Sequence, residues 1–229
     1  MYINTEAIVL HIAKYSDNTS ILHAYTRDNG RMQYIVHISR KKNIANQLQP
    51  LSYVELESGE NKAGSQFRHL KSVRLLFVPQ KTDFYRLSVS IFISEVLYRI
   101  LRHPMPDAEL FDYLVATMRS IDTENSVANS HLQFLLNLTP YLGIMPSIDL
   151  NYDWLDMQTG LPASVLPAHK DCFSKQEMQV MNALSNFDEV CLTRTERQVL
   201  LEKLCRYYEL HITDFHTPKS LDILKELFD

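Results

Sequence analysis

The tripeptide Asp28-Asn29-Gly30 constrains the fold of this 229-residue chain more than any other feature of its sequence. An Asn-Gly pair tolerates the positive φ angles that a tight β-hairpin turn requires. Residues 31–38 after the turn alternate as a strand with one buried face does, and residues 19–26 before it are rich in β-branched and aromatic side chains. The sequence therefore predicts a hairpin that leads into the basic loop Arg40-Lys41-Lys42.

Five strand candidates of this kind lie before residue 80, at residues 6–12, 19–26, 31–38, 51–57 and 67–77. Turn residues separate them, and no helical periodicity competes over this length. Five strands in so short a segment favour a small closed barrel such as the OB-fold, a frequent oligonucleotide-binding architecture. We therefore expect an OB-fold nucleic-acid-binding domain over residues 1–80.

From residue 82 onward the apolar residues follow a helical period. We expect a largely buried helix over residues 83–103, ended by Pro104, and two further helices over residues 107–120 and 126–141. After an irregular connector, capping boxes at Ser174 and Thr193 start two more helices, and Thr217-Pro218 begins a short final one. The predicted fold class is α+β, with an all-α helical domain over residues 81–229.

The two parts differ in charge. Residues 1–80 contain ten Lys or Arg residues against six Asp or Glu, a net charge of +4. Residues 81–229 contain 13 basic residues against 21 acidic ones, a net charge of -8. A positive module joined to a negative one predicts that the first part meets a polyanion, and chance segregation of solvated charges is the alternative.

Binding to a nucleic acid backbone needs cations, and base stacking needs aromatic faces. The phosphate-contact candidates are Arg31, Arg40, Lys41 and Lys42, with Lys71 and Arg74 as weaker ones. The aromatic candidates are Tyr25, Tyr34, Tyr53, Phe67 and His37. We expect most of these rings in the core and one or two on the binding face, and we assign Tyr34 to DNA binding. The alternative for each cation is a solvated surface position.

The sequence contains no motif of a known catalytic class. None of its five glycines forms a phosphate-binding loop with a following Lys-Ser or Lys-Thr pair, and its nine histidines include no HExxH pair. Acidic pairs such as Asp188-Glu189, or Asp153 with Asp156, could bind Mg²⁺, but isolated acidic pairs are usually solvated. We predict a binding protein that is not an enzyme, and an RNA-binding OB-fold adaptor and a metal-dependent nuclease remain as alternatives.

The N-terminus lacks a basic segment followed by an apolar one, and charged residues interrupt the most apolar run, residues 84–101. The three cysteines are odd in number and include no Cys-x-x-Cys pair. We expect neither secretion nor a membrane span, and a cytoplasmic location.

Sequence blocks in both parts of the chain resemble the RecO family of bacterial DNA repair and recombination proteins. In the first part they are Glu6-Ala7-Ile8-Val9-Leu10, Tyr15-Ser16-Asp17, Tyr25-Thr26, Gly30-Arg31 and the basic loop. Near the end they are Tyr207-Tyr208-Glu209-Leu210-His211, Lys219-Ser220-Leu221 and Ile223-Leu224. The resemblance implies an N-terminal OB-fold, a helical C-terminal domain and a nucleoid-associated role in recombinational repair.

The resemblance also implies partners. Members of that family bind single- and double-stranded DNA, anneal complementary strands, and act with RecR to load the recombinase RecA, an indirect partner, on DNA coated by single-strand-binding protein. The acidic, aromatic-ended tail of single-strand-binding protein needs a cation beside an apolar pocket. Arg99, Arg102 and Arg119 are the candidates for that contact in the helical part.

This chain departs from the family pattern at one place. Many relatives carry a four-cysteine zinc site after the third helix, and structural zinc needs four such soft or imidazole ligands. The connector over residues 143–173, which takes the place of that site, offers His169 and Cys172. We therefore predict no metal and no cofactor, and expect the connector to be ordered by packing around Trp154 and Leu155.

Overall fold

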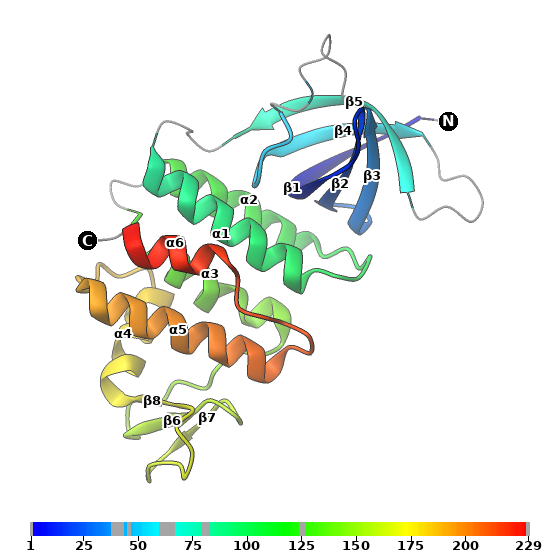
Figure 1. Ribbon diagram of the computed structural model, residues 1–229. Coiled ribbons are helices and arrows are strands. Elements are labelled where there is room, and N and C mark those ends of the chain that lie inside the picture. Colours follow the sequence, from blue (N-terminus) through cyan, green and yellow to red (C-terminus); the bar gives the residue numbers. More distant parts are fainter. Residues whose placement is uncertain are drawn as a thin grey trace. The chain divides into compact units, whose positions relative to one another are not determined.

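The computed structural model describes residues 2–37, 44, 47–59, 67–78, 83–123 and 127–227 (Figure 1). Contacts within the chain divide it into two compact units, Met1–Asn125 and Ser126–Asp229. The first unit contains β1 (Tyr2–Ser16), β2 (Thr19–Thr26), β3 (Gly30–His37), β4 (Tyr53–Gly59), β5 (Phe67–Phe77), α1 (Phe84–Ile100) and α2 (Ala108–Thr123). The second contains α3 (Ser130–Leu138), a 3-10 turn (Pro140–Leu142), β6 (Trp154–Asp156), β7 (Leu161–Ala163), β8 (Cys172–Ser174), α4 (Lys175–Ser185), α5 (Arg194–His211) and α6 (Ser220–Leu227).

The first five strands form a closed barrel in the order β1-β2-β3-β5-β4, which confirms the predicted five-stranded barrel. The β3–β5 pairing is parallel, and β4 pairs antiparallel with β1 to close the barrel. Four strands lie close to their predicted ranges, whereas β1 extends four residues beyond its range at each end. Each predicted range carries β-branched or aromatic residues between turn residues. A cluster of buried apolar residues fills the interior: Ala7, Val9, Leu22, Ala24, Tyr34, Val36, Leu48, Val54 and Leu56.

The hairpin turn between β2 and β3 confirms the prediction from Asn29-Gly30. Gly30 has a φ angle of +64° and pairs with Thr26 at the end of the ladder. A Cβ atom at this position would lie 2.4 Å from the backbone oxygen of Met105, in the segment between α1 and α2. The turn therefore needs glycine for two reasons, its positive φ and the close approach of another backbone segment.

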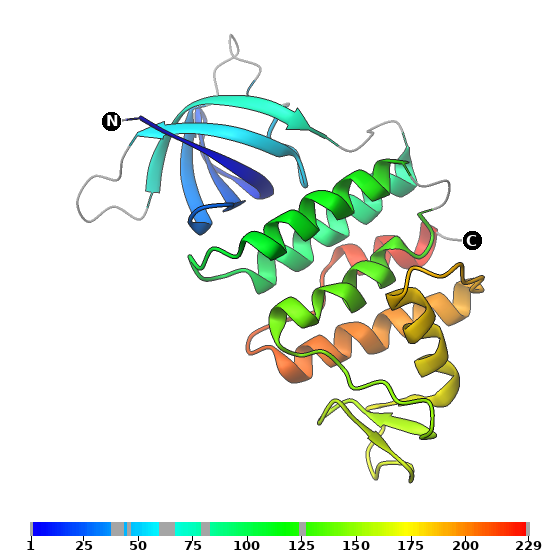
Figure 2. The same cartoon turned by 180° about the vertical axis from the view of Figure 1, so that it is seen from behind.

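Helix α1 lies against the barrel, with α2 beside it (Figure 2). Asp83 caps its N-terminus, because the Asp83 side chain accepts hydrogen bonds from the backbone N–H groups of Tyr85 and Arg86. A narrow polar stripe along this helix, formed by Arg86, Ser90, Ser94 and Arg99, is buried or half-buried. Ser94 is 2% exposed and donates a hydrogen bond of 2.6 Å to the backbone oxygen of Leu10 in β1. A serine in this stripe therefore attaches the helix to the barrel.

The second unit is mainly helical, but it is not all-α as predicted. The connector between α3 and α4 contains a three-stranded sheet in the order β7-β6-β8. Each of these strands has three residues, too few to show an alternating pattern in the sequence. Leu155 is fully buried as expected, whereas Trp154 is partly exposed.

Both predicted capping boxes are present in the second unit. Ser174 and Glu177 exchange hydrogen bonds at the start of α4, and Thr193 and Glu196 do so at the start of α5. No helix among the described residues is both long enough and apolar enough to span a bilayer.

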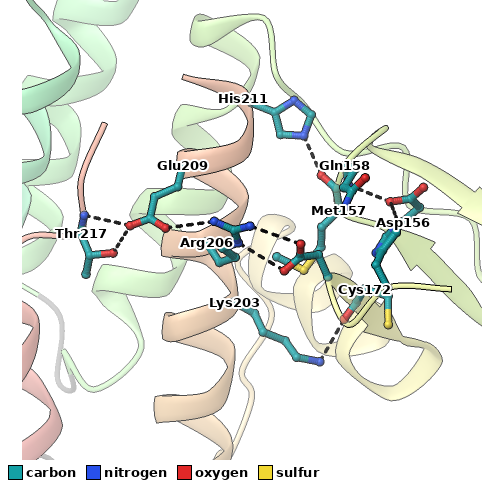
Figure 3. A network of polar contacts seen from close by, with 11 residues as sticks. Asp156, Met157, Gln158, Cys172, Lys203, Arg206, Glu209, His211 and Thr217 are labelled. Carbon is teal, nitrogen blue, oxygen red and sulfur yellow. Dashed lines mark hydrogen bonds and ion pairs between the residues drawn. The ribbon is translucent and has the colours of Figure 1, made fainter. Parts of the chain in front are cut away.

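One face of α5 holds the connector in place (Figure 3). Arg206 donates two hydrogen bonds to the Asp171 carboxylate, from Nε at 3.2 Å and from Nη2 at 3.3 Å. Lys203 donates to the backbone oxygen of Cys172 at 3.1 Å, Tyr207 to that of Ile144 at 2.8 Å, and His211 to that of Met157 at 2.8 Å. These four α5 residues recur at helical spacing and so lie on one face. The C-terminal sequence block recognised above therefore includes two residues that fasten the connector.

The Asp171–Arg206 pair predicts an acid-sensitive contribution to stability. The hydrogen bond from Arg206 lowers the pKa of Asp171, although burial opposes it. A carboxyl group with a lowered folded-state pKa stabilises the fold above its ordinary pKa of about 3.9, and the contribution is lost as pH falls through the lowered value. Replacing Arg206 with Met should reduce the free energy of unfolding by about 1–2 kcal/mol at neutral pH.

Urea unfolding of the Arg206→Met variant at a series of pH values tests this prediction. The difference from the wild type should shrink as Asp171 protonates below about pH 4. Lys175→Met is the matched control, since Lys175 lies 3.7 Å from Asp153 and both side chains are largely exposed. A difference for Arg206→Met that is as small as that of the control, or that does not change with pH, would contradict the assignment.

Candidate nucleic-acid interface

Arg31, the first predicted phosphate contact, holds the end of a helix. Its Nη1 atom donates hydrogen bonds to the backbone oxygens of Tyr98 at 3.0 Å and Leu101 at 2.9 Å, where α1 ends. These are carbonyls that a helix C-terminus leaves unpaired, and a cation there is also favoured by the helix dipole. The guanidinium group lies over the Tyr98 ring, 4.5 Å from its centroid. Arg31 is therefore held in place by the end of α1, and its contact with phosphate stays a prediction.

The charge of Arg31 has no carboxylate partner among the described residues. Its second amino group, Nη2, lies 3.0 Å from Nδ1 of His23, and burial lowers the pKa of the Arg31 guanidinium. Burial, together with the Arg31 charge, lowers the pKa of His23 to about 4, so His23 is neutral at physiological pH. Arg31 is therefore a partly buried cation whose hydrogen-bond partners are neutral.

The strand register explains why these groups meet. His11 in β1 pairs directly with His23 in β2, and Arg31 in β3 pairs with Tyr25, two residues from His23 on the same face. Tyr98 of α1 packs against this face, with its ring centroid 4.9 Å from that of His11. Sequence reasoning missed His11, His23 and Tyr98. The register of the β1–β2 pair shifts between Lys14 and Ser16, so counting back from the turn would not have paired His11 with His23.

The arginine on the other side of the turn also joins the barrel to a helix. Arg27 lies 3.2 Å from the carboxylate of Glu6 in β1 and 2.5 Å from that of Asp112 in α2. Its guanidinium group lies 4.6 Å from the centroid of the Phe111 ring. The two arginines flank the hairpin turn. Arg27 joins the barrel to α2, and Arg31 joins it to α1.

A cavity of about 670 Å³ opens between α1 and the barrel. Its polar lining comes from Arg31 and His11 of the barrel and from Glu95, Tyr98, Arg99 and Arg102 of α1 and the segment after it. Leu10, Pro50 and Ile91 supply apolar wall. The cavity brings Arg31, predicted to contact DNA, together with Arg99 and Arg102, predicted to contact a protein partner.

The three guanidinium groups outnumber the acidic groups in this cavity. Glu95 is the acidic residue of the lining, and it pairs with Arg99 at 2.5 Å. Burial and the Arg31 charge lower the pKa of His11, which keeps its ring neutral at physiological pH. The described lining thus carries a net charge of about +2, which suits an anionic ligand.

Lys71 and Arg74, the weaker candidates, lie on the exposed surface of β5, opposite acidic residues of β4. Lys71 is 2.8 Å from Glu57, and its Nζ atom lies 3.8 Å from the centroid of the Tyr2 ring. Arg74 donates two hydrogen bonds to Glu55, at 2.9 and 3.0 Å. Each cation is therefore balanced by a neighbouring carboxylate, and phosphate contact by either one stays a prediction.

Tyr34 does not have the position that base stacking requires. Its side chain is fully buried in the barrel core, and burial raises its pKa to about 12. The structure thus corrects its assignment to DNA binding. Tyr25, at 1% exposure, and Tyr53, at 9%, are also buried. Phe67 is partly exposed and His37 is exposed, so these two remain as candidates for stacking.

The remaining predicted residues fall into two groups. Arg40, Lys41 and Lys42 lie outside the described residues, so their proposed phosphate contacts stay a prediction. Arg119 is exposed on α2 and does not line the cavity. The three arginines predicted to bind a partner protein are thus not brought together at one place.

The connector does not provide the ligands of a structural zinc site. Residues 143–173 are all described, and their soft or imidazole side chains are His169 and Cys172. His169 lies 3.4 Å from the Asp156 carboxylate, and Cys172 is buried. No group of three or more His, Cys, Asp or Glu side chains in the described part of the chain has the arrangement of a metal site. A four-ligand zinc site does not fit these residues.

A closed five-stranded barrel with a cationic cavity beside it, followed by helices, defines a protein of the OB-fold class with a helical C-terminal part. Two family models match the chain. The model described as Recombination protein O N terminal matches residues 1–78, and the one described as Recombination protein O C terminal matches residues 81–221.

The two models meet near residue 80, where the sequence predicts the domain division, whereas the contacts place α1 and α2 with the barrel. The predicted domain boundary at residue 80 therefore stays a prediction.

Full-length relatives agree with the two models. The chain is 34% identical to the DNA repair protein RecO of Phocaeicola vulgatus over 98% of both chains, and 35% identical to that of Bacteroides fragilis over 98% of both. It is 31% identical to the DNA repair protein RecO of Flavobacterium psychrophilum over 100% of both chains. The chain belongs to the RecO family of DNA repair and recombination proteins, which are recombination mediators and not enzymes.

Proposed function

We propose that this protein binds single- and double-stranded DNA through its first unit and anneals complementary strands. With RecR, it would help to load recombinase on DNA coated by single-strand-binding protein, in the cytoplasm at the nucleoid. The observation that carries the proposal is the barrel of a RecO-family protein with an arginine-lined cavity formed by the barrel and α1. An OB-type barrel offers a surface for oligonucleotides, and the arginines offer contacts to phosphate.

Annealing has a simple electrostatic basis in this proposal. Two DNA strands repel each other through their phosphates, and a cationic surface that contacts both lowers this repulsion. Contacts to phosphate carry no sequence information, which suits a protein that anneals strands of any sequence. No bond is made or broken in this mechanism, in agreement with the absence of enzymatic activity in the family.

The partner contacts are proposed for the helical part of the chain. Arg99, Arg102 and Arg119 stay the candidates for the acidic tail of single-strand-binding protein: Arg99 and Arg102 line the cavity, and Arg119 is exposed on α2. An exposed cation of this kind steers an acidic peptide and adds modest affinity. RecR is proposed as the second protein partner from family membership alone.

Charge reversal in the basic loop tests the proposed function. The double variant Lys41→Glu, Lys42→Glu should lose most oligonucleotide binding and strand annealing, because two attractive contacts to phosphate become repulsive. Fluorescence anisotropy with a labelled single strand measures the binding, and Lys14→Glu, an exposed change on β1, is the matched control. Normal binding by the double variant would show that another surface carries the DNA.

An RNA competitor distinguishes the main alternative in the same assay. Contacts to phosphate do not separate RNA from DNA, so an RNA strand of the same sequence should compete with similar strength for the loop. RNA that displaces DNA far more efficiently than DNA itself would favour an RNA-binding adaptor.

A further inference from the structure

The cavity between α1 and the barrel has the chemistry of a site for a doubly charged anion. Three guanidinium groups line it, from Arg31, Arg99 and Arg102, against the carboxylate of Glu95. A phosphate monoester carries a charge of about -1.5 to -2 at neutral pH, whereas an internal phosphate of a DNA strand carries one negative charge. The net charge of the lining therefore matches a terminal phosphate better than an internal one.

The central cation of this site is held in a fixed position. Arg31 is fastened by hydrogen bonds to the backbone oxygens of Tyr98 and Leu101, and its other neighbour is the neutral His23 ring. These contacts fix the guanidinium group without neutralising its charge. A preorganised cation binds an anion more strongly than a mobile one, because less side-chain freedom is lost on binding.

The size and walls of the cavity point to more than a bare phosphate. A volume of about 670 Å³ lies within the range that holds drug-sized ligands. Leu10, Pro50 and Ile91 provide apolar surface beside the arginines, which suits the sugar and base that follow a terminal phosphate. Arg102 is exposed at the C-terminal end of α1, where its Nε atom donates to the backbone oxygen of Arg99 at 2.8 Å.

We propose that this cavity binds the terminal phosphate of a nucleotide, either free in solution or at the end of a DNA strand. The DNA-end form rests on the proposed function, because it requires that the protein bind DNA. A phosphate monoester would accept hydrogen bonds from Arg31 and Arg102, the sugar and base would lie along the apolar wall, and the rest of a strand would leave through the open side. The protein would then distinguish strand ends from continuous DNA.

Equilibrium binding with the full chain tests this proposal with two matched pairs of probes. The first pair is a short oligothymidylate with a 5′-phosphate and the same strand with a 5′-hydroxyl. The second is thymidine monophosphate and thymidine. We expect the phosphorylated member of each pair to bind about 10-fold more tightly, the effect of about one additional charge-assisted contact.

Arg102→Gln should remove the preference for phosphate in both pairs, because it takes away one of the guanidinium groups of the site. The exposed position of Arg102 makes this change compatible with folding. Lys14→Gln, which changes an exposed cation of β1 that does not line the cavity, should leave the preference intact.

The outcomes separate this proposal from the proposed function. Equal binding of the two strands, with no binding of thymidine monophosphate, would overturn the cavity proposal and leave DNA binding in place. Binding of thymidine monophosphate without binding of either strand would overturn the proposed function and support a site for free nucleotides. An acidic peptide with a C-terminal phenylalanine is the last probe. If this peptide binds the cavity and thymidine monophosphate does not, the cavity is a peptide site and the cavity proposal is overturned.

Discussion

Replacing Gly30 with Ala should be among the most destabilising single changes in this chain. The φ angle of +64° is strained for any residue with a Cβ atom, and that atom would lie 2.4 Å from the backbone of Met105. Backbone strain and overpacking together should lower the free energy of unfolding by about 2–4 kcal/mol. The turn and the segment between α1 and α2 meet at this glycine, and both belong to the first unit. The loss of stability should therefore affect the first unit.

Two other glycines separate the two causes. Gly143 has a φ angle of +69° and no atom within 4 Å of its Cβ position, so Gly143→Ala reports strain alone. Gly59 has neither a positive φ angle nor a close neighbour, so Gly59→Ala should change the free energy of unfolding little. Urea unfolding of the three variants, followed by circular dichroism, should rank the losses as Gly30, then Gly143, then Gly59. A Gly30 variant no less stable than the Gly59 variant would contradict the structure of the turn.

Replacing Arg31 with Met should have the second-largest effect. The change keeps much of the side-chain volume but leaves the backbone oxygens of Tyr98 and Leu101 without their donor. Hydrogen bonds to a charged donor contribute about 1.5–3 kcal/mol each, and relief of the burial of the charge offsets part of this loss. We expect the free energy of unfolding to fall by about 2–3 kcal/mol. Lys71→Met, at an exposed ion pair, is the control and should change the free energy of unfolding much less than Arg31→Met does.

The His23 ring provides a second readout of the Arg31 variant. Burial and, after it, the Arg31 charge lower the pKa of His23 to about 4, so removal of that charge should raise the pKa. It should stay below the ordinary value of about 6.5, because burial is the larger cause. NMR titration of the histidine ring measures the shift. An unchanged pKa of His23 would mean that the guanidinium group does not lie beside the ring.

The parts of the fold with a local signal were predictable from the sequence. β-Branched and aromatic residues between turns predict the strands of the barrel, Asn29-Gly30 predicts the hairpin, and the capping boxes predict α4 and α5. The strands β6, β7 and β8 have no such signal, because three residues are too few for a pattern. Their order depends instead on contacts with α5, whose partners lie tens of residues away in the chain.

The candidate site was less predictable, because the sequence gives the type of a residue but not its partners. An arginine next to a hairpin turn looks the same whether it meets solvent or the end of a helix, and Arg31 meets α1. An aromatic residue in an alternating strand is equally ambiguous, and Tyr34 lies in the core. The cavity joins side chains from β1, β3 and α1, so no single stretch of sequence contains its pattern.

The salt dependence of single-strand binding tests the central claim, that the positively charged first unit binds DNA through contacts to its phosphates. If Arg40, Lys41 and Lys42 neutralise one phosphate each and the cavity neutralises a fourth, log K should fall with log salt at a slope of about -0.7 × 4, or about -2.8. That slope corresponds to a loss of affinity on the order of 50-fold between 50 and 200 mM salt. Tight binding with a slope near zero would show that contacts to phosphate do not hold the strand, and would contradict the account.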